Sequence, residues 1–145
     1  MARRRTSDLA GEALREGMRR LNARHPWSHN DHFHSWIIAN LPEPCRSVLD
    51  VGCGRGELLA ALAPHADHVV GADIDAEMRD VATRHCERLM NVSVTDRAWN
   101  EVEGLFDAVT MIAVLHHLPV EEALRDVKRL LAPGGRFLVV GLAVP

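Results

Sequence analysis

The stretch Asp50-Val51-Gly52-Cys53-Gly54-Arg55-Gly56 places three glycines at alternate positions directly after a short apolar run, residues 47–51. Residues 57–63, which follow, carry leucines at helical spacing. The glycines therefore lie between a predicted strand and a predicted helix. Glycine lets the backbone turn sharply and lets a ligand touch the main chain. The stretch predicts a tight strand-to-helix turn that holds a ligand.

Outward from this turn, apolar segments of strand length alternate with segments of helical periodicity. Apolar strands separated by helices are typical of a parallel sheet that is covered on both faces. Residues 95–105 carry the weakest pattern and are either a loop or a short helix. The predicted strands are 47–51, 68–72, 92–94, 106–112 and 137–140, and the predicted helices are 8–21, about 30–40, 57–63, 75 to about 89, and a last helix that Pro119 opens.

Two of these helices carry more detailed predictions. Asp75 is the predicted N-cap of the helix that follows the second strand. In the last helix, the apolar side chains recur at helical spacing and are predicted to face the core. They are Val120, Leu124, Val127 and Leu131.

The glycine spacing and one carboxylate distinguish two adenosine ligands for the turn. A dinucleotide site follows the pattern Gly-x-Gly-x-x-Gly/Ala, whereas here Gly56 comes one residue early and Glu57 occupies the expected third position. Asp50 would repel a pyrophosphate but suits S-adenosylmethionine, which has an ammonium group, a sulfonium and no phosphate. Asp73, at the end of the second strand, can accept hydrogen bonds from both ribose hydroxyls of either ligand. These residues favour S-adenosylmethionine, and a nicotinamide-dependent oxidoreductase is the less favoured alternative.

Five segments, in order along the chain, resemble the motifs of class I S-adenosylmethionine-dependent methyltransferases, and the resemblance covers about residues 46–141. It implies an α/β, three-layer Rossmann-like fold with a mainly parallel sheet in the order 3-2-1-4-5 and helices on both faces. Strands six and seven of fuller members are missing from the pattern. The segments are Val48 to Gly56, Val69 to Met78, Thr95-Asp96, Phe106 to Leu118, and Leu130 to Phe137.

The resemblance assigns the methionine and ribose ends of the cofactor by position. Asp50, Gly52 and Gly54 are expected to line the methionine end, and Asp73 to hold the ribose. Cys53, in the same loop, is either a cofactor contact or a small buried residue.

The adenine end and a lid are assigned in the same way. Ile74 and Met78 are expected against the adenine, and Asp96 is expected to accept a hydrogen bond from the adenine amino group. Met111 is expected near the cofactor after the fourth strand. His32, on the N-terminal segment that often covers the cofactor in this family, is a further candidate.

His116 and His117 follow the fourth strand, beside the expected position of the methyl group. Either can act as a general base, or the pair can brace the loop. Methyl transfer from a sulfonium depends first on in-line placement. We therefore expect SN2 transfer to an O, N or C nucleophile of a small molecule. No Asn-Pro-Pro-Tyr-type motif follows the fourth strand, which argues against nucleic-acid methylation.

Composition limits the class of protein. The formal charge of −3 in 145 residues predicts no strong attraction to nucleic acid or membrane. Three scattered cysteines without a Cys-x-x-Cys pair predict a reducing cytoplasmic location. No His, Cys and carboxylate pattern predicts a metal site. Residues 1–45 are expected to form a helical cap on a cofactor-binding domain of residues 46–145.

The chain ends at the fifth predicted strand, whose apolar residues 137–140 would form a sheet edge. Such an edge offers unpaired main-chain groups to a neighbour. We expect either a fragment of a longer enzyme or a homodimer that covers this edge. A cofactor-binding module that is catalytically incomplete is therefore an alternative to an active methyltransferase.

Overall fold

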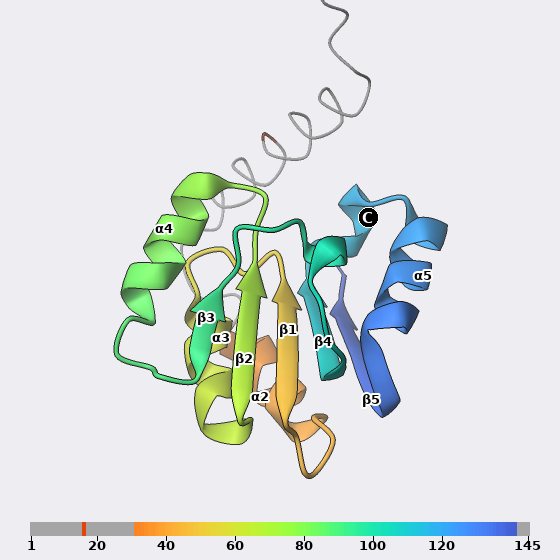
Figure 1. The fold of residues 1–145 in the computed structure, drawn as a ribbon, viewed down its shortest axis with the longest axis horizontal. Coiled ribbons are helices and arrows are strands. Elements are labelled where there is room, and N and C mark those ends of the chain that lie inside the picture. Colours follow the sequence, from red (N-terminus) through yellow and green to blue (C-terminus); the bar gives the residue numbers. More distant parts are fainter. Residues whose placement is uncertain (1–15, 17–30, 142–145) are drawn as a thin grey trace, which may run out of the picture.

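The structure, a computed structural model, describes Glu16 and residues 31–141 (Figure 1). Helices and strands alternate along the described chain. In chain order they are α2 (Asp31–Ala39), β1 (Ser47–Val51), α3 (Glu57–Leu62), η1 (Ala63–His65), β2 (His68–Ala72), α4 (Ala76–His85), β3 (Val92–Val94), η2 (Trp99–Glu101), β4 (Phe106–Ile112), η3 (Leu115–His117), α5 (Val120–Leu130) and β5 (Leu131–Val140).

The five strands form one sheet in the order β3-β2-β1-β4-β5, and every neighbouring pair is parallel. All carboxyl ends therefore lie along one edge of the sheet, at the arrowheads in Figure 1. The predicted α/β fold and its strand order are confirmed. The order reverses direction at β1 and β4, where ligands bind in open sheets of this kind.

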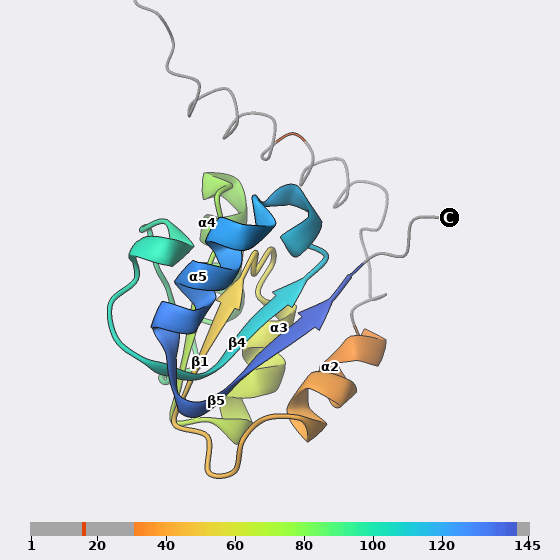
Figure 2. The ribbon, with the colours of Figure 1, turned by 90° about the vertical axis from the view of Figure 1, so that its right-hand side faces the viewer.

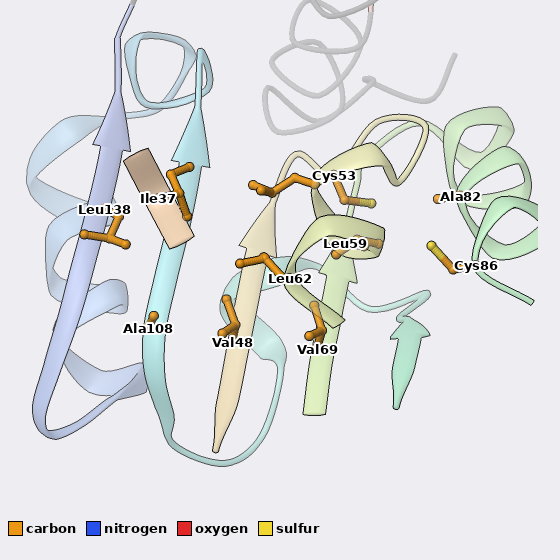
Figure 3. Packing of buried hydrophobic residues seen from close by; sticks show 11 residues of the cluster. Ile37, Val48, Cys53, Leu59, Leu62, Val69, Ala82, Cys86, Ala108 and Leu138 are labelled. Carbon is orange, nitrogen blue, oxygen red and sulfur yellow. The ribbon is translucent and has the colours of Figure 1, made fainter. Parts of the chain in front are cut away.

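Helices cover both faces of the sheet, with α5 on one side and α2 and α3 on the other (Figure 2). On the α5 face, Val127 and Leu130 pack with Leu49, Val51 and Met111. The opposite face carries a second cluster from α2, α3, α4 and alternate residues of the strands (Figure 3). Its members include Ile37, Val48, Leu59, Leu62, Val69, Ala82, Cys86 and Ala108. Burial on both faces explains why the strands read as nearly continuous apolar runs.

The predicted core face of α5 is wrong in part. Val120 and Leu124 are 49% and 45% exposed, and the buried stripe consists of Ala123, Val127 and Leu130. Leu131 does not belong to the helix, because it begins β5 and pairs with Phe106 on β4. Leu130 must face the core directly before this pairing. The other apolar stripe of the helix, which contains Val120 and Leu124, therefore faces solvent.

Several boundaries also differ from the predictions. The helix α4 ends at His85 rather than near residue 89, with the buried Cys86 as its C-cap. Residues 95–105 contain a single 3-10 turn, η2. The strand β5 begins at Leu131 rather than at residue 137, and its pairing with β4 contains a register shift between Phe106 and Ala108. The predicted helix 8–21 lies outside the described residues apart from Glu16, which is helical.

Candidate cofactor site

The turn after β1 has the sharp geometry that its glycines predict. Gly52, Gly54 and Gly56 have φ angles of 78°, 54° and 83°, a region that side-chain-bearing residues rarely adopt. The main-chain N–H groups of Gly52 and Cys53 donate to the carbonyl oxygen of Ala72, at 2.7 and 3.0 Å. These bonds tie the turn to the end of β2.

Gly56 also serves helix packing. A β carbon built there would lie 3.1 Å from the β carbon of Ala82 and 3.3 Å from the Sγ atom of Cys86, both near the end of α4. The third glycine therefore lets α4 approach the start of α3. The spacing of the three glycines does not predict this role of Gly56 in packing.

Asp73, directly after β2, holds its carboxylate in a fixed orientation. Its Oδ2 atom accepts a hydrogen bond from the N–H of Gly54 at 2.9 Å, and its Oδ1 atom accepts from the N–H of Asp75 at 2.8 Å. The residue is 7% exposed. Burial raises the pKa of the carboxyl, while the two N–H donors and the Arg79 guanidinium lower it. Asp73 thus joins the glycine turn to the start of α4.

A cleft of about 760 Å³ opens beside Asp73 at the carboxyl edge of the sheet. Small-molecule sites commonly enclose about 300–1,000 Å³. The walls come from the ends of β1 and β2, the start of α4, the η2 loop and the segment after β4. The lining residues are Val51, Gly52, Ala72, Asp73, Ile74, Asp75, Ala76, Glu77, Arg79, Asp96, Arg97, Ala98, Trp99, Asn100, Val114 and Leu118.

The cleft brings together four of the residues that the sequence assigned to the cofactor. They are Gly52, Asp73, Ile74 and Asp96. Gly54 is attached to them through its hydrogen bond to Asp73.

Asp50 lies beneath the turn and does not line the cleft. It pairs in register with Thr110 on β4, and the Thr110 hydroxyl donates to its Oδ1 atom at 2.8 Å. Successive side chains of a strand point to opposite faces, so Asp50 points away from the face on which its neighbours Leu49 and Val51 pack. Asp50 is 3% exposed, and this burial raises the pKa of its carboxyl to about 7. The hydrogen bond from Thr110 acts in the opposite direction and lowers the pKa. The charge of Asp73 raises it further.

The other predicted cofactor residues do not line the cleft. Met111 is fully buried in the cluster on the α5 face, and Met78 is half-buried on α4. Cys53 is buried in the opposite cluster, and burial raises the pKa of its thiol. His32 lies in the first turn of α2, and its side chain falls outside the described residues. Only the backbone position of His32 is therefore defined.

His116 and His117 form the end of η3, between Val114 and Leu118, which both line the cleft. Their ring centroids are 3.9 Å apart. Burial and the neighbouring His116 lower the pKa of His117 below its ordinary value of 6.5. His117 is therefore neutral at physiological pH and available to accept a proton.

Several lining residues had no prediction attached to them. Trp99 and Asn100 belong to the unpatterned loop, and Arg79 belongs to the first turn of α4. The side-chain amide of Asn100 donates to Asp126 on α5 at 3.2 Å, and Arg129 on α5 donates to the Asn100 carbonyl oxygen. Tertiary contacts with α5 thus place this wall, and no local pattern in the sequence signals them.

These residues fit an adenosine ligand that carries positive charge. Asp73 supplies a buried, oriented carboxylate for a diol, and the turn exposes main chain rather than side chain. The lining contains four carboxylates, from Asp73, Asp75, Glu77 and Asp96, and two guanidinium groups. Such a lining is unfavourable for a pyrophosphate and suits S-adenosylmethionine. Among the residues described, no group of three His, Cys, Asp or Glu side chains is arranged to hold a metal ion.

A family described as "Methyltransferase domain" matches residues 48–135. This range is more than half of the chain and contains the glycine turn, the buried carboxylates of Asp50 and Asp73, and the His116-His117 pair. The chain belongs to the class I S-adenosylmethionine-dependent methyltransferases. S-adenosylmethionine is the cofactor of this family, in agreement with the site.

Known proteins support the assignment. An uncharacterized methyltransferase of Mycobacterium tuberculosis is 37% identical over 123 residues, which are 83% of this chain and 62% of that protein. The chain therefore spans about three fifths of the length of this relative.

Solved structures share the fold. The N-methyltransferase NodS of Bradyrhizobium japonicum, in complex with S-adenosyl-L-homocysteine, superimposes with a TM-score of 0.70 at 19% identity. This match covers 90% of this chain and 71% of NodS. DhpI, in a complex with SAM and HEP, superimposes with a TM-score of 0.73 at 23% identity over 99% of this chain and 69% of DhpI.

Proposed function

We propose that this methyltransferase chain binds S-adenosylmethionine in the cleft at the carboxyl edge of the sheet and transfers its methyl group to an O, N or C nucleophile of a small molecule. The observation that carries the proposal is the buried carboxylate of Asp73, held by two N–H donors at the end of a cleft of suitable size. S-adenosylmethionine supplies an electrophilic methyl group on a sulfonium, so that one in-line displacement completes the transfer.

The chain's residues bind and orient in this scheme. Asp73 accepts from the ribose hydroxyls with the lone pairs that Gly54 and Asp75 leave free. Ile74 packs against the adenine, and Asp96 accepts from its amino group. Asp50 acts through its charge from beneath the turn rather than by direct contact. Since positioning accounts for much of the acceleration of such a transfer, these residues matter more than any single proton carrier.

His117 is the residue best suited to move a proton. Its neutral imidazole can take the proton that an O–H or N–H acceptor releases when the new bond to carbon forms. The His116 ring lies beside it at a tilt of 42°, and burial together with His116 lowers the pKa of His117. A carbon or amine acceptor without a proton to lose in the transition state would leave the pair as a brace for the loop.

Calorimetry with three ligands tests the cofactor. S-adenosylmethionine and S-adenosylhomocysteine should bind with dissociation constants in the micromolar range, on the order of −8 kcal/mol, and NAD should show no binding. Tighter binding of NAD than of S-adenosylhomocysteine would show that the site is a dinucleotide site and that the proposal is wrong.

Two further expectations concern the whole protein. No helix in the described part of the chain is long and apolar enough to cross a membrane. We propose a cytoplasmic location.

We also propose that the chain associates with a second copy through the edge of β5. Light scattering tests the second expectation, because a monomer at micromolar concentration would contradict it.

A further inference from the structure

Arg79 occupies an unusual place in the cleft. It ends the first turn of α4, is half-buried, and lines the same cleft as Asp73. Of the residues that line this cleft, only Arg79 and Arg97 carry a positive charge. Arg97 is largely exposed and lies 3.8 Å from a carboxylate oxygen of Glu103. Of these two cations, Arg79 is therefore the one that is half-buried in the wall of the cleft.

The contact of Arg79 is directed at the end of β2. Its Nη1 atom donates a hydrogen bond to the main-chain oxygen of Asp73 at 2.9 Å. The main-chain N–H of Arg79 donates to the Asp75 carbonyl oxygen at 3.0 Å, as the first turn of α4 requires. The guanidinium thus joins α4 to Asp73, which lines the cleft.

The charges around Asp73 are otherwise unfavourable for an ionised carboxylate. Burial raises the pKa of Asp73, and the Asp75 carboxylate raises it further. Asp50 lies close enough for the Asp73 charge to raise its pKa, and the Cys53 thiol responds to both carboxylates. The N–H groups of Gly54 and Asp75 and the Arg79 guanidinium act in the opposite direction.

We infer that Arg79 is a positioning residue of the cofactor site, which fixes the end of β2 through the Asp73 carbonyl and keeps the Asp73 carboxylate charged for the ribose hydroxyls. This inference rests on the proposed function. A carboxylate accepts hydrogen bonds more strongly when it is ionised, so Arg79 acts on the cofactor through Asp73. The competing explanation is that Arg79 only holds α4 and β2 together and has no electrostatic effect on the Asp73 carboxylate.

The test measures the affinity of the full chain for S-adenosylhomocysteine by calorimetry from pH 4.5 to 9. Because Asp50, with a pKa of about 7, titrates in this range, each profile is also measured in an Asp50→Asn background, where the acidic limb that remains belongs to Asp73. Arg79→Met removes the charge and the hydrogen bond but keeps an apolar stem of similar length. Arg79→Lys keeps the charge. Arg84→Met, an exposed arginine on the same helix, is the matched control, and thermal unfolding shows whether each variant is folded.

In Arg79→Met, the acidic limb of the affinity profile should move to higher pH by up to about one unit, because the guanidinium contacts the main-chain oxygen of Asp73 and not its carboxylate. This shift makes binding on that limb up to about tenfold weaker, while the loss shrinks toward high pH. Arg79→Lys should restore the wild-type limb, and Arg84→Met should not move it. If Arg79→Met does not fold, the comparison of Arg79→Lys with Arg79→Gln gives the same reading.

An equal loss of affinity at every pH, with Lys no better than Met or Gln, would overturn the inference, because a mechanical clamp would act in that way. Unchanged affinity in a folded Arg79→Met protein would also overturn it. Failure of the wild-type chain to bind S-adenosylhomocysteine at any pH is a different result. It would remove the proposed function and the inference with it.

Discussion

Asp50→Asn should stabilise the ligand-free fold and weaken cofactor binding. Asp50 is buried with a pKa of about 7, against 3.8 for an ordinary aspartate. Between these values the folded protein holds a proton that the unfolded chain releases, so the free energy of unfolding falls as pH rises. Above pH 7 the penalty of the buried charge reaches on the order of 4 kcal/mol.

The asparagine keeps an oxygen that can accept from the Thr110 hydroxyl and carries no charge to bury. Relative to wild type, Asp50→Asn should therefore be more stable at pH 8.5, by up to about 4 kcal/mol less the cost of any unpaired amide N–H, about 1–3 kcal/mol. Near pH 4 the charge penalty of the wild type is gone, so the variant should show no gain in stability and only the cost of that amide should remain. Urea unfolding of the ligand-free proteins at pH 4.5, 6.5 and 8.5 measures the difference.

Asp80→Asn, at an exposed position on α4, controls for the loss of one negative charge. A stability difference between Asp50→Asn and wild type that is the same at all three pH values would refute the reasoning, because it would show that Asp50 carries no buried charge. In the same variant, the affinity for S-adenosylmethionine should fall more than the affinity for S-adenosylhomocysteine, since only the former has a sulfonium.

Three other substitutions test separate parts of the site. Asp73→Ala should weaken the binding of S-adenosylhomocysteine by about 1.5–3 kcal/mol, the range for hydrogen bonds to a charged group; unchanged affinity in a folded protein would refute the ribose role. Gly56→Ala should lower the free energy of unfolding by about 1–2 kcal/mol for its positive φ and about 1–3 kcal/mol more for overpacking against α4. Gly134→Ala has a similar φ and open space around it, so it should show only the first cost, and equal losses would contradict the packing argument. Arg129→Met should cost up to about 1 kcal/mol of stability and change the fluorescence of Trp99, because the η2 loop loses one of its two hydrogen bonds to α5; an unaltered spectrum with unaltered affinity would argue against that bond.

The fold could be predicted from the sequence because its signals are local. Apolar runs of strand length, a glycine turn and the Asp75 cap each act within a few residues, and the structure places β1, β2, β3 and β4 at the predicted bounds. The interior face of α5 could not be predicted in this way. Both stripes of that helix carry apolar side chains, and the choice between them depends on the pairing of Leu131 with Phe106, 25 positions earlier in the chain.

The residues of the candidate site also differ in whether local sequence signals predict their positions. Asp73 and Ile74 could be predicted because the end of a parallel strand fixes the place of the next residues. Arg79 and Trp99 could not, since their positions depend on how α4 and the η2 loop pack on the sheet. Met111 follows from neither argument, because motif position alone does not tell which face of β4 a side chain takes.

The alternation of side chains along β1 also changes the meaning of its carboxylate. Val51 lines the cleft and packs on the α5 face, so Asp50, one position earlier, must point to the other face. Asp50 and Asp73 are both buried acids near the same turn, yet of the two only Asp73 lines the cleft. A contact role for both would predict similar losses of affinity for a neutral and a charged cofactor. A long-range role for Asp50 predicts that its loss depends on the charge of the ligand and on salt concentration, whereas the loss in Asp73→Ala depends on neither. The roles of the two carboxylates are therefore distinguished by how the loss of affinity depends on ligand charge and ionic strength, and not by the size of that loss.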